Sequence, residues 1–512
     1  MVKLRNFIDT TYCRYLCYQQ AKKKIPIISC KRPEFNHYEG QTYSKFEVVK
    51  LATQGWYHEK SKGDYFTIYG HDTDKPKTEV YKKTFEEMGL CENLCKVMSQ
   101  QGFSLPTAIQ VKAFSPILQG YNTSMTAETG CGKTLAYLLP IMQHLIEWKP
   151  HVQEEFNSPL AVVITPSREL ATQIGEVAQS ISENLNINVT TLLGGKTKKQ
   201  IMDPPIEYCD LLVATLGAFS KMVTTGIYKI HNIHHVVLDE ADTLLDDSFI
   251  EKLTALLKKF QIRFKVDNKI PPEGCQVTFA SATLPHEMPE AVNSFMAPES
   301  LRTVATSNIH KIIPNVPHKF LRLGKAQKPA ELLKLVQADL NMKRQVMIFS
   351  NKTSTCDFVS MFLNENNIEC LNINGRMAVP LKMGKFEQFK TGQVCVLSCT
   401  DIASRGLDTT SASIIVYYKV NFYILTFPPP VSHIINYDFP LYTSDYIHRS
   451  GRTGRIGSPS GCSITNFIAW PREINLVQKI ETAVRRNTEL PNVNANIRRQ
   501  IMNRIVKMSQ VA

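Results

Sequence analysis

Two short stretches of the chain carry the residue types that are needed to bind and split a triphosphate. The first, AETGCGKT at residues 127–134, has glycines at 130 and 132 followed by Lys133 and Thr134. Glycines let backbone amides turn toward phosphate oxygens, a lysine in this place can reach the β and γ phosphates, and a threonine hydroxyl can ligate Mg²⁺. Ala127 stands where the generic phosphate loop has glycine, so this stretch alone also fits an ordinary turn before a helix.

The second stretch, VVLDEAD at residues 236–242, places three carboxylates at the end of an apolar run. Asp239 at the tip of a buried strand can hold Mg²⁺ directly or through water, and Glu240 beside it can polarise the water that attacks the γ-phosphate. Acids that only cap the next helix would explain one carboxylate, but they would not predict a phosphate loop upstream. The two stretches together predict an ATP site whose metal ligands are Thr134 and Asp239.

Short branched-apolar runs alternate with longer helical patterns from about residue 85 onward, and they supply the frame for these groups. Such runs are typical of parallel strands buried on both faces, and their alternation with helices predicts doubly wound α/β domains. The runs of the first half are LAVVIT (160–165), CDLLVAT (209–215), HHVVLDEAD (234–242) and QVTFASAT (276–283). Those of the second half are QVMIFSN (345–351), IECLNING (368–375), QVCVLSCT (393–400) and VSHIINYD (431–438).

A proline-containing stretch after Thr306 has few helix signals and predicts a linker between two such domains. Residues 1–32 are strongly basic, with Asp9 as their one acid, which fits either an organelle transit segment or an RNA-binding arm. The predicted division is a basic N-terminal extension at 1–80, a first domain at 81–305, a linker at 306–318, a second domain at 319–482 and a basic tail at 483–512.

The charge balance favours a polyanionic partner. Lys and Arg number 59 against 46 Asp and Glu, and the resulting net charge of +13 favours nucleic acid or an anionic membrane. No apolar run reaches the roughly 18 residues that cross a bilayer, so membrane insertion is not expected. The 13 cysteines show no paired zinc-ligand spacing, which argues against a disulfide framework and a structural zinc site.

The motifs AETGCGKT, DEAD (239–242), SAT (281–283) and HRSGRTGR (448–455) occur in this order and resemble those of the DEAD-box family of ATP-dependent RNA helicases. The resemblance covers roughly residues 85–480. It implies an α/β fold of two tandem RecA-like domains, each a mostly parallel sheet flanked by helices. DEADTLLDDSF, together with the basic start, looks most like the mitochondrial DEAD-box helicases of animals.

The resemblance also implies roles for individual residues of the first domain. Phe85 would stack on adenine, and Gln110 would pair its amide with the base edge, in a motif that includes Thr107. The implied phosphate loop comprises Ala127, Glu128, Thr129, Gly130, Cys131, Gly132, Lys133 and Thr134. The implied contacts with RNA phosphates and sugars are Pro166, Arg168, Gly194, Gly195, Thr215 and Gly217. The implied coupling residues are Asp242, Ser281 and Thr283.

In the second domain, the implied RNA contacts are Gly375, Thr400 and Asp401. Asp408 would lie near the ribose, and His448 would be positional rather than catalytic. Arg452 and Arg455 would act as arginine fingers, because the γ-phosphoryl group needs positive charge from outside the phosphate loop. Because HRSGRTGR is so basic, its arginines would also fit a role in RNA binding alone.

Three places depart from the family pattern. The family's TPGR element reads TLGA at 215–218, which removes an arginine and predicts weaker RNA binding. Val379 and Lys382 stand where the family has glutamine and arginine, and lysine meets a phosphate only as a point charge. The segment 412–430, ASIIVYYKVNFYILTFPPP, interrupts the spacing of the last two motifs, and part of it echoes SHIINYD. We expect a gene-model or splicing artefact, with a surface hairpin as the alternative.

These features predict an RNA-stimulated ATPase that acts as a monomer, uses ATP and Mg²⁺, and closes on single-stranded RNA or short duplexes through backbone contacts without reading sequence. The alternatives are a non-hydrolysing RNA clamp or assembly scaffold, and a DNA translocase. Protein partners cannot be named. The expected location is the mitochondrial matrix, with ribosome assembly as a candidate role, and the alternative location is the nucleus or nucleolus.

Overall fold

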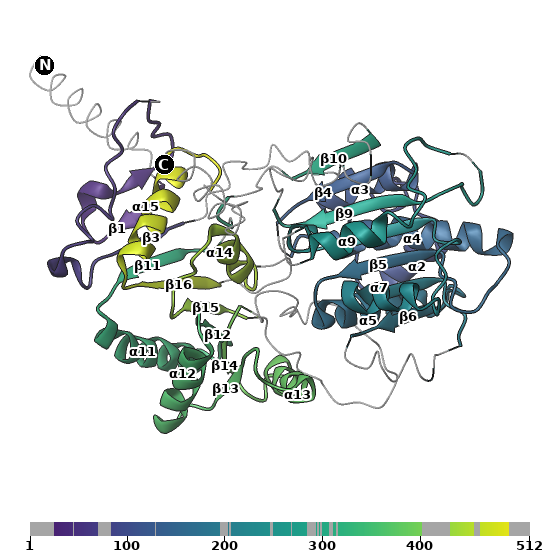
Figure 1. The fold of residues 1–512 in the computed structure, drawn as a ribbon. Helices are drawn as coiled ribbons and strands as arrows, with labels where there is room; N and C mark the ends of the chain where they lie inside the picture. The colour runs from purple at the N-terminus through teal and green to yellow at the C-terminus, as the bar shows by residue number, and fades with distance from the viewer. Residues whose placement is uncertain are drawn as a thin grey trace, which may run out of the picture.

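Two parallel-rich sheets, one in each half of the chain, organise the computed structural model of this protein (Figure 1). The structure describes residues 25–44, 46–69, 83–128, 130–194, 206–245, 249–267, 269–283, 300–306, 311–313, 316–401, 431–454 and 461–490, with the single residues 203, 293 and 296. The basic start at 1–24, the segment 412–430 and the tail beyond 490 lie outside the described residues.

The first sheet is parallel throughout, with the strand order β10-β4-β9-β8-β5-β7-β6. Its strands are β4 (Asn122–Thr126), β5 (Ala161–Thr165), β6 (Val189–Leu192), β7 (Leu211–Thr215), β8 (His235–Asp239), β9 (Gln276–Ser281) and β10 (Leu301–Ala305). Its helices are α2 (Glu92–Gln100), α3 (Ala108–Leu118), α4 (Lys133–Trp148), α5 (Arg168–Ser182), α7 (Leu216–Thr224), α8 (Ala241–Leu244) and α9 (Ile250–Leu257).

Helices cover both faces of this sheet, which explains why its central strands are apolar without alternation. Val163 and Val237 pack in one core cluster with residues of α2 to α5, whereas their neighbours Val162 and Val236 pack in a second cluster with residues of α7 and α9. Successive side chains of a strand point to opposite faces, so each strand needs apolar residues at every position. The predicted doubly wound arrangement is confirmed.

The second sheet has the order β13-β14-β12-β15-β16-β11-β3-β1-β2. Its parallel part consists of β11 (His318–Arg322), β12 (Val346–Phe349), β13 (Cys370–Ile373), β14 (Val396–Cys399), β15 (His433–Asn436) and β16 (Ser463–Ile468). Its helices are α11 (Lys328–Asn341), α12 (Thr353–Glu365), α13 (Val379–Lys390), α14 (Thr443–Ser450) and α15 (Pro471–Arg485). The strand between β12 and β16 is β15, which lies within SHIINYD (432–438).

Three strands from the N-terminal region extend this second sheet. They are β1 (Pro26–Cys30), β2 (His37–Tyr38) and β3 (Tyr65–Ile68), and β3 pairs antiparallel with β11. Phe66 stacks on Phe320 with 4.8 Å between ring centroids. The sequence assigned residues 1–80 to an extension outside the catalytic domains. The structure instead builds residues 26–68 into the second domain, because these short strands bury Ile28, Phe66 and Ile68 against it.

A buried carboxylate fixes this N-terminal region to the last helix. Glu481 of α15 is 0% exposed and accepts hydrogen bonds from the backbone nitrogens of Ala52 (2.6 Å) and Thr53 (3.1 Å) and from the Thr53 hydroxyl (2.8 Å). Its remaining partner is Arg485, whose Nη2 lies 2.8 Å away and also donates to the carbonyl of Phe35. A buried charge that is paired and fully hydrogen-bonded is tolerated. These bonds therefore fix the position of the N-terminal region relative to α15.

Candidate nucleotide and RNA site

The phosphate-loop residues lie between the end of β4 and the start of α4, at the carboxyl edge of the first sheet. Gly130 and Gly132 have φ angles of 80° and 91°, a left-handed region that glycine enters without cost. A Cβ on Gly132 would lie 2.6 Å from Nε2 of Gln110, so a side chain there would displace the glutamine. Lys133 donates from Nζ to the carbonyls of Ala127 (2.7 Å) and Glu128 (2.8 Å). The Lys133 ammonium group is thus held by two backbone carbonyls at the start of the loop.

The adenine-reading candidates lie against this loop. Thr107 caps α3 in a reciprocal pair with Gln110, whose Oε1 accepts from the Thr107 backbone nitrogen at 2.8 Å. The other end of the same amide, Nε2, donates to the carbonyl of Gly132 at 3.2 Å. Gln110 therefore links its motif to the phosphate loop. Phe85 is 6% exposed and belongs to the first domain's core cluster.

Asp239 is the last residue of β8, two strands away from β4 in the sheet, and Glu240 and Asp242 come just after it. Asp239 is 5% exposed, and its carboxylate accepts from the Glu240 backbone nitrogen (2.8 Å to Oδ1) and from the Tyr137 hydroxyl (2.9 Å to Oδ2). Burial raises the pKa of Asp239 above its usual value. Glu240 has a left-handed backbone (φ 50°, ψ 50°), which is uncommon outside glycine and turns the chain sharply into α8.

These residues fit a hard divalent cation. Asp239 and Thr134 offer only oxygen atoms beside the phosphate loop, and Mg²⁺ is held by one or two carboxylates together with substrate phosphates. Among the described residues no group of three His, Cys, Asp or Glu side chains could hold a metal. Two oxygen donors leave the other coordination positions of Mg²⁺ to the nucleotide and to water.

The SAT motif contacts both of these segments. Thr283 donates to Oδ2 of Asp242 from its hydroxyl (2.7 Å) and its backbone nitrogen (3.3 Å). The carbonyl of Ser281 accepts from the Ala127 nitrogen at 3.2 Å, and the Ser281 hydroxyl donates to the carbonyl of Thr283. A shift of this motif would therefore be transmitted to the acids and to the phosphate loop.

The candidate RNA contacts of the first domain gather where β5, β7 and β6, which are neighbours in the sheet, reach the same edge. The backbone nitrogen of Gly194 donates to the Thr215 hydroxyl at 3.2 Å, and a Cβ on Gly194 would lie 3.8 Å from Nε of Arg168. Pro166 precedes Arg168, and Gly217 on the first turn of α7 is exposed. Ala218, where the family has arginine, is 1% exposed in the core and has no polar atom to offer a phosphate.

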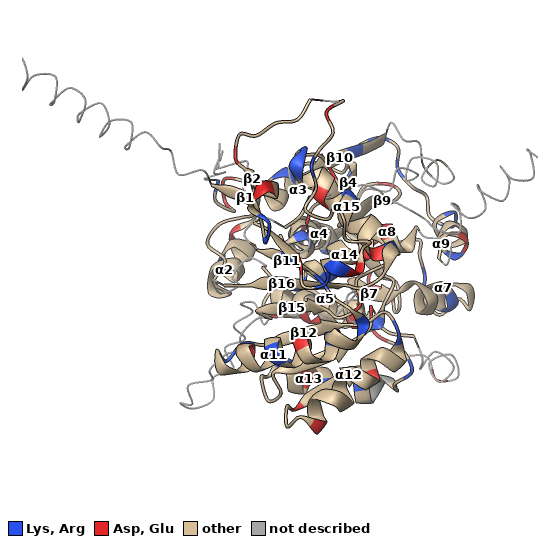
Figure 2. Ribbon diagram, turned by 90° about the vertical axis from the view of Figure 1, so that its left-hand side faces the viewer, with Lys and Arg blue, Asp and Glu red and all other residues tan. Residues whose placement is uncertain are grey.

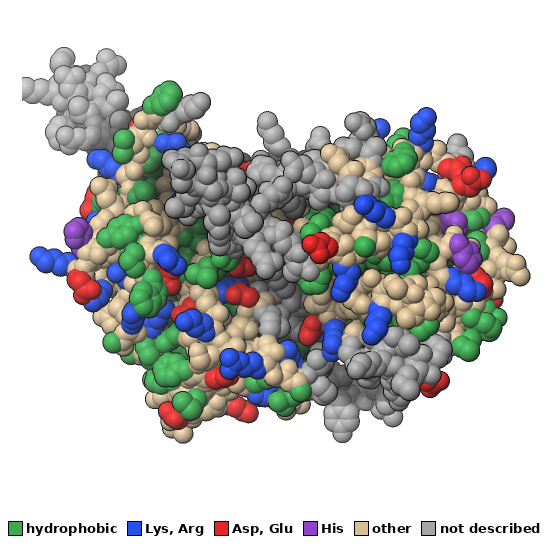
Figure 3. Space-filling view, in the orientation of Figure 1, with side chains coloured by type: hydrophobic (Ala, Val, Ile, Leu, Met, Phe, Trp, Pro, Cys, Tyr) green, Lys and Arg blue, Asp and Glu red, His purple; other side chains and the backbone are tan. Residues whose placement is uncertain are grey.

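Positive side chains continue from this edge over the outer face of the first domain. Figure 3 shows Lys and Arg gathered near α7 and α9 on the face turned to the viewer. The exposed members on these helices and the turn after α9 are Lys221, Lys252, Lys258 and Lys259. The surface beside the candidate RNA edge is thus suited to a polyanion.

In the second domain, Asp401 forms an ion pair with Arg449, which the sequence analysis did not single out. Arg449 is 0% exposed, and its Nε and Nη2 lie 2.6 and 2.7 Å from the two carboxylate oxygens of Asp401. The same guanidinium bonds Asn436, Asn351 and the carbonyl of Asp438. The position of Arg449 between His448 and Arg452 in HRSGRTGR was the signal in the sequence that could have identified it. Gly375 is exposed after β13, and Thr400 is 8% exposed at the end of β14.

HRSGRTGR meets the acid motif across the two domains. Nε2 of His448 lies 3.8 Å from Oδ2 of Asp242, and α14 lies beside α8 in Figure 2. Arg452 follows α14 closely and is 6% exposed. The structure thus brings together the coupling residues Asp242, Thr283 and His448. Four predicted site residues lie outside the described residues: Thr129, Gly195, Asp408 and Arg455.

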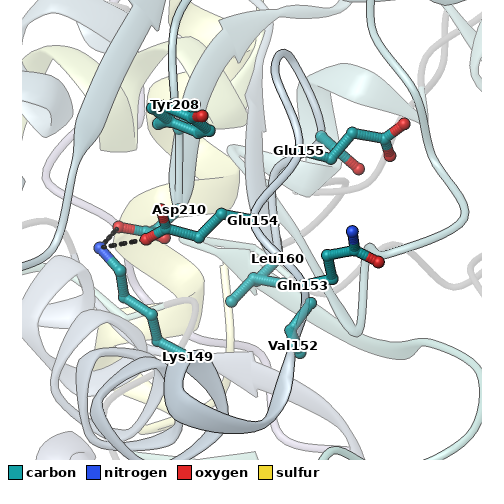
Figure 4. Close-up of a pocket in the computed structure, with 10 residues that line it drawn as sticks. Lys149, Val152, Gln153, Glu154, Glu155, Leu160, Tyr208 and Asp210 are labelled. Atoms are coloured by element: carbon teal, nitrogen blue, oxygen red, sulfur yellow. Dashed lines mark hydrogen bonds and ion pairs between the residues drawn. The ribbon is translucent and has the colours of Figure 1, made fainter.

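A separate small pocket lies at the opposite, amino edge of the first sheet (Figure 4). It is lined by Glu154, Glu155, Tyr208 and Cys209, among others, and by Lys149, whose Nζ lies 2.8 Å from Oδ2 of Asp210. None of the predicted site residues lines it. Within the described ranges, no helix combines the length and the apolar character that are needed to cross a membrane.

Comparisons with known proteins agree with this geometry. The DEAD/DEAH box helicase family model matches residues 107–292, and the model of the helicase conserved C-terminal domain matches residues 327–457. The chain is 34% identical over 92% of its length to a Mus musculus protein named probable ATP-dependent RNA helicase DDX28, of which it covers 86%. The Homo sapiens protein of the same name is 33% identical, with the same coverage of both chains.

Solved structures show the same fold at lower identity. The DEAD-box helicase Mss116 bound to single-stranded RNA and UDP-BeF superposes with a TM-score of 0.65 at 22% identity, covering 79% of each chain. S. cerevisiae Dbp5 bound to RNA and ADP BeF3 gives a TM-score of 0.63 at 23% identity, covering 79% of this chain and 94% of that one. The expected pair of tandem RecA-like domains is thereby confirmed.

Proposed function

This chain belongs to the DEAD/DEAH box helicase family and is an ATP-dependent RNA helicase of the DEAD-box type, and from this premise we propose that ATP held between its two domains closes them on a single RNA strand. The supporting observation is the contact between His448 of the second domain and Asp242 of the DEAD motif, at 3.8 Å. ATP hydrolysis would then release the strand, so that short duplexes are parted locally.

The proposed roles follow from position and chemistry. Lys133 leaves the carbonyls of its own loop to meet the β and γ phosphates, and Thr134 and Asp239 hold Mg²⁺ on the nucleotide. Bound there, Mg²⁺ would neutralise charge that develops on the phosphate oxygens. Glu240, the residue after Asp239, orients and polarises the attacking water. Arg452 and Arg455 supply positive charge from the second domain.

The proposed partner is RNA gripped by its backbone. Backbone amides, threonine hydroxyls and Arg168 suit phosphates and sugars, which carry no sequence information. Gly194, Gly195, Thr215 and Gly217 would serve one domain, and Gly375, Thr400 and Asp401 would serve the other. Because Asp401 already holds Arg449 with both oxygens, its role is to position the loop beside the RNA.

A non-hydrolysing RNA clamp is the second candidate, because the arginine of the family's TPGR element is replaced by buried Ala218. ATP turnover by the wild type and by Glu240→Gln, each with RNA, DNA or neither, separates the candidates. Our proposal predicts turnover that RNA stimulates and that Glu240→Gln abolishes while RNA binding with ATP persists. Equal turnover without RNA would contradict coupled closure, and no turnover by the wild type would favour the clamp.

We also propose residence in the mitochondrial matrix, with structured or ribosomal RNA as the target. The support is the basic composition of residues 1–32. A reporter fused to residues 1–40 should be directed to mitochondria, whereas a diffuse cytosolic or nuclear signal would contradict the assignment and favour the nucleus or nucleolus.

A further inference from the structure

A tyrosine that belongs to none of the family motifs lies on the helix of one proposed metal ligand, Thr134, and contacts the other, Asp239. Tyr137 lies on the first turns of α4, one helical turn after Lys133 and Thr134, and its side chain is 0% exposed. Its hydroxyl donates to Oδ2 of Asp239 at 2.9 Å, from α4 across to the end of β8. One phenol therefore joins the phosphate-loop helix to the acid motif.

The contact fixes the direction of the Asp239 carboxylate. Oδ1 accepts from the Glu240 backbone nitrogen at 2.8 Å and Oδ2 accepts from Tyr137, so rotation about the bond that carries the carboxylate would break at least one of these bonds. Each carboxylate oxygen has two lone pairs, so both can still face a cation or its water. Burial raises the pKa of Asp239, and the hydrogen bond from Tyr137 acts in the opposite direction.

We propose that Tyr137 is a positioning residue that holds Asp239 in the orientation in which it binds the magnesium ion of Mg-ATP. The inference rests on the proposed function, because it assumes that Asp239 is a protein ligand of the metal. Partners that orient metal ligands commonly change metal affinity by about 10-fold to 100-fold when they are removed. Tyr137 touches neither nucleotide nor water in this account and is therefore not catalytic.

Phenylalanine at this position separates orientation from packing, because it keeps the ring and removes only the hydroxyl. The matched control is Tyr228→Phe, since Tyr228 is a buried tyrosine of the same domain, 2% exposed, whose hydroxyl lies 3.5 Å from Oε1 of Glu207 and away from the site. Asp239→Asn serves as the reference for loss of the ligand itself.

The measurement is the affinity of the full chain for a fluorescent ADP analogue, titrated with Mg²⁺ and repeated in EDTA. We expect the wild type to gain affinity with Mg²⁺ and Asp239→Asn to lose most of that gain. Tyr137→Phe should need an Mg²⁺ concentration about 10-fold higher than the wild type for the same gain in affinity for the analogue. Its affinity in EDTA, and both properties of Tyr228→Phe, should match the wild type.

Three results would overturn the inference. A wild-type Mg²⁺ requirement in Tyr137→Phe, with the effect of Asp239→Asn intact, would refute the role of Tyr137 and leave the proposed metal site standing. A loss of affinity in EDTA as well would show that the hydroxyl supports the fold of the site rather than the metal. A wild type that does not respond to Mg²⁺, or an Asp239→Asn variant that responds normally, would refute the proposed metal site and this inference with it.

Discussion

Several side chains assigned to ATP or RNA hydrogen-bond to their own chain. Lys133 bonds two loop carbonyls, Gln110 bonds Thr107 and Gly132, and Asp401 bonds Arg449. The residue types and their order in the chain marked these positions, because phosphate and base recognition demand them. Their partners could not be predicted, because hydrogen bonds such as the one between Tyr137 and Asp239 join elements far apart in sequence.

Buried histidines make the stability of both domains sensitive to acid. Burial lowers the pKa of His144 to about 4 and that of His318 to about 3. Both rings are neutral in the folded chain at neutral pH, whereas the unfolded chain takes up protons as the pH falls through about 6.5. The free energy of unfolding should therefore decrease between about pH 6.5 and 4, by roughly 1.4 kcal/mol per pH unit for each ring.

Urea unfolding at pH 7.5, 6 and 5 checks this expectation. His144→Gln, whose amide can still donate to the Leu118 carbonyl that the ring now contacts at 3.0 Å, should show a smaller loss between pH 6 and 5. His58→Gln, at an exposed position, should keep the wild-type slope. An unchanged slope in His144→Gln would count against burial as the cause.

At the scale of elements, apolar runs predicted β5, β7, β8 and β9 of the first sheet and β12 to β15 of the second. They missed β6 and β10 at the edges of the first sheet, β11 and β16 inside the second, and β4, the strand before the phosphate loop. β4 has the sequence NTSMT and is buried at every position. Because most of its residues are polar, it does not form an apolar run in the sequence. Asn122 explains how it is tolerated, because its amide donates to the carbonyl of Arg263 and accepts from the nitrogen of Val277. Polar groups can be buried when each finds a partner, and the sequence does not show the partner.

The N-terminal strands should be required for the stability of the second domain. Deletion of residues 1–69 removes β3 from β11 and Phe66 from Phe320, which leaves an unpaired apolar edge. Glu481 keeps Arg485 but loses its three hydrogen bonds from Ala52 and Thr53. We expect a lower melting temperature, faster amide hydrogen exchange in β11 and a tendency to aggregate. Deletion of residues 1–24 keeps all three strands and should leave β11 protected. Equal exchange rates in β11 for both deletions would show that these strands are dispensable.

At the scale of the whole molecule, the chain passes between the domains twice. The described residues between 25 and 69 belong to the second domain, those between 83 and 306 to the first, and those between 316 and 490 to the second again. The order of motifs predicted two domains and the site between them. The double connection was not predicted, because strand pairing between β3 and β11 joins residues that lie far apart in the sequence.

The net charge of +13 predicts RNA binding that weakens steeply with salt. Each phosphate contact on a single strand contributes about 0.7 to the slope of the logarithm of affinity against the logarithm of salt concentration. Arg168→Gln should lower that slope by about this amount for every RNA sequence tested. Arg302→Gln, on β10 at the far edge of the sheet beside Tyr121, should not change it. Equal slopes for the two variants would remove Arg168 from the RNA contacts.

The central claim is that the second domain brings arginine to the nucleotide held by the first. Single-turnover ATP hydrolysis with saturating RNA, by the wild type, Arg452→Ala and the control Arg472→Ala at an exposed site on α15, tests it most directly. Our account predicts that Arg452→Ala binds ATP and RNA but hydrolyses ATP at least about 1,000-fold more slowly, while Arg472→Ala behaves as the wild type. Hydrolysis by Arg452→Ala at the wild-type rate would contradict the account.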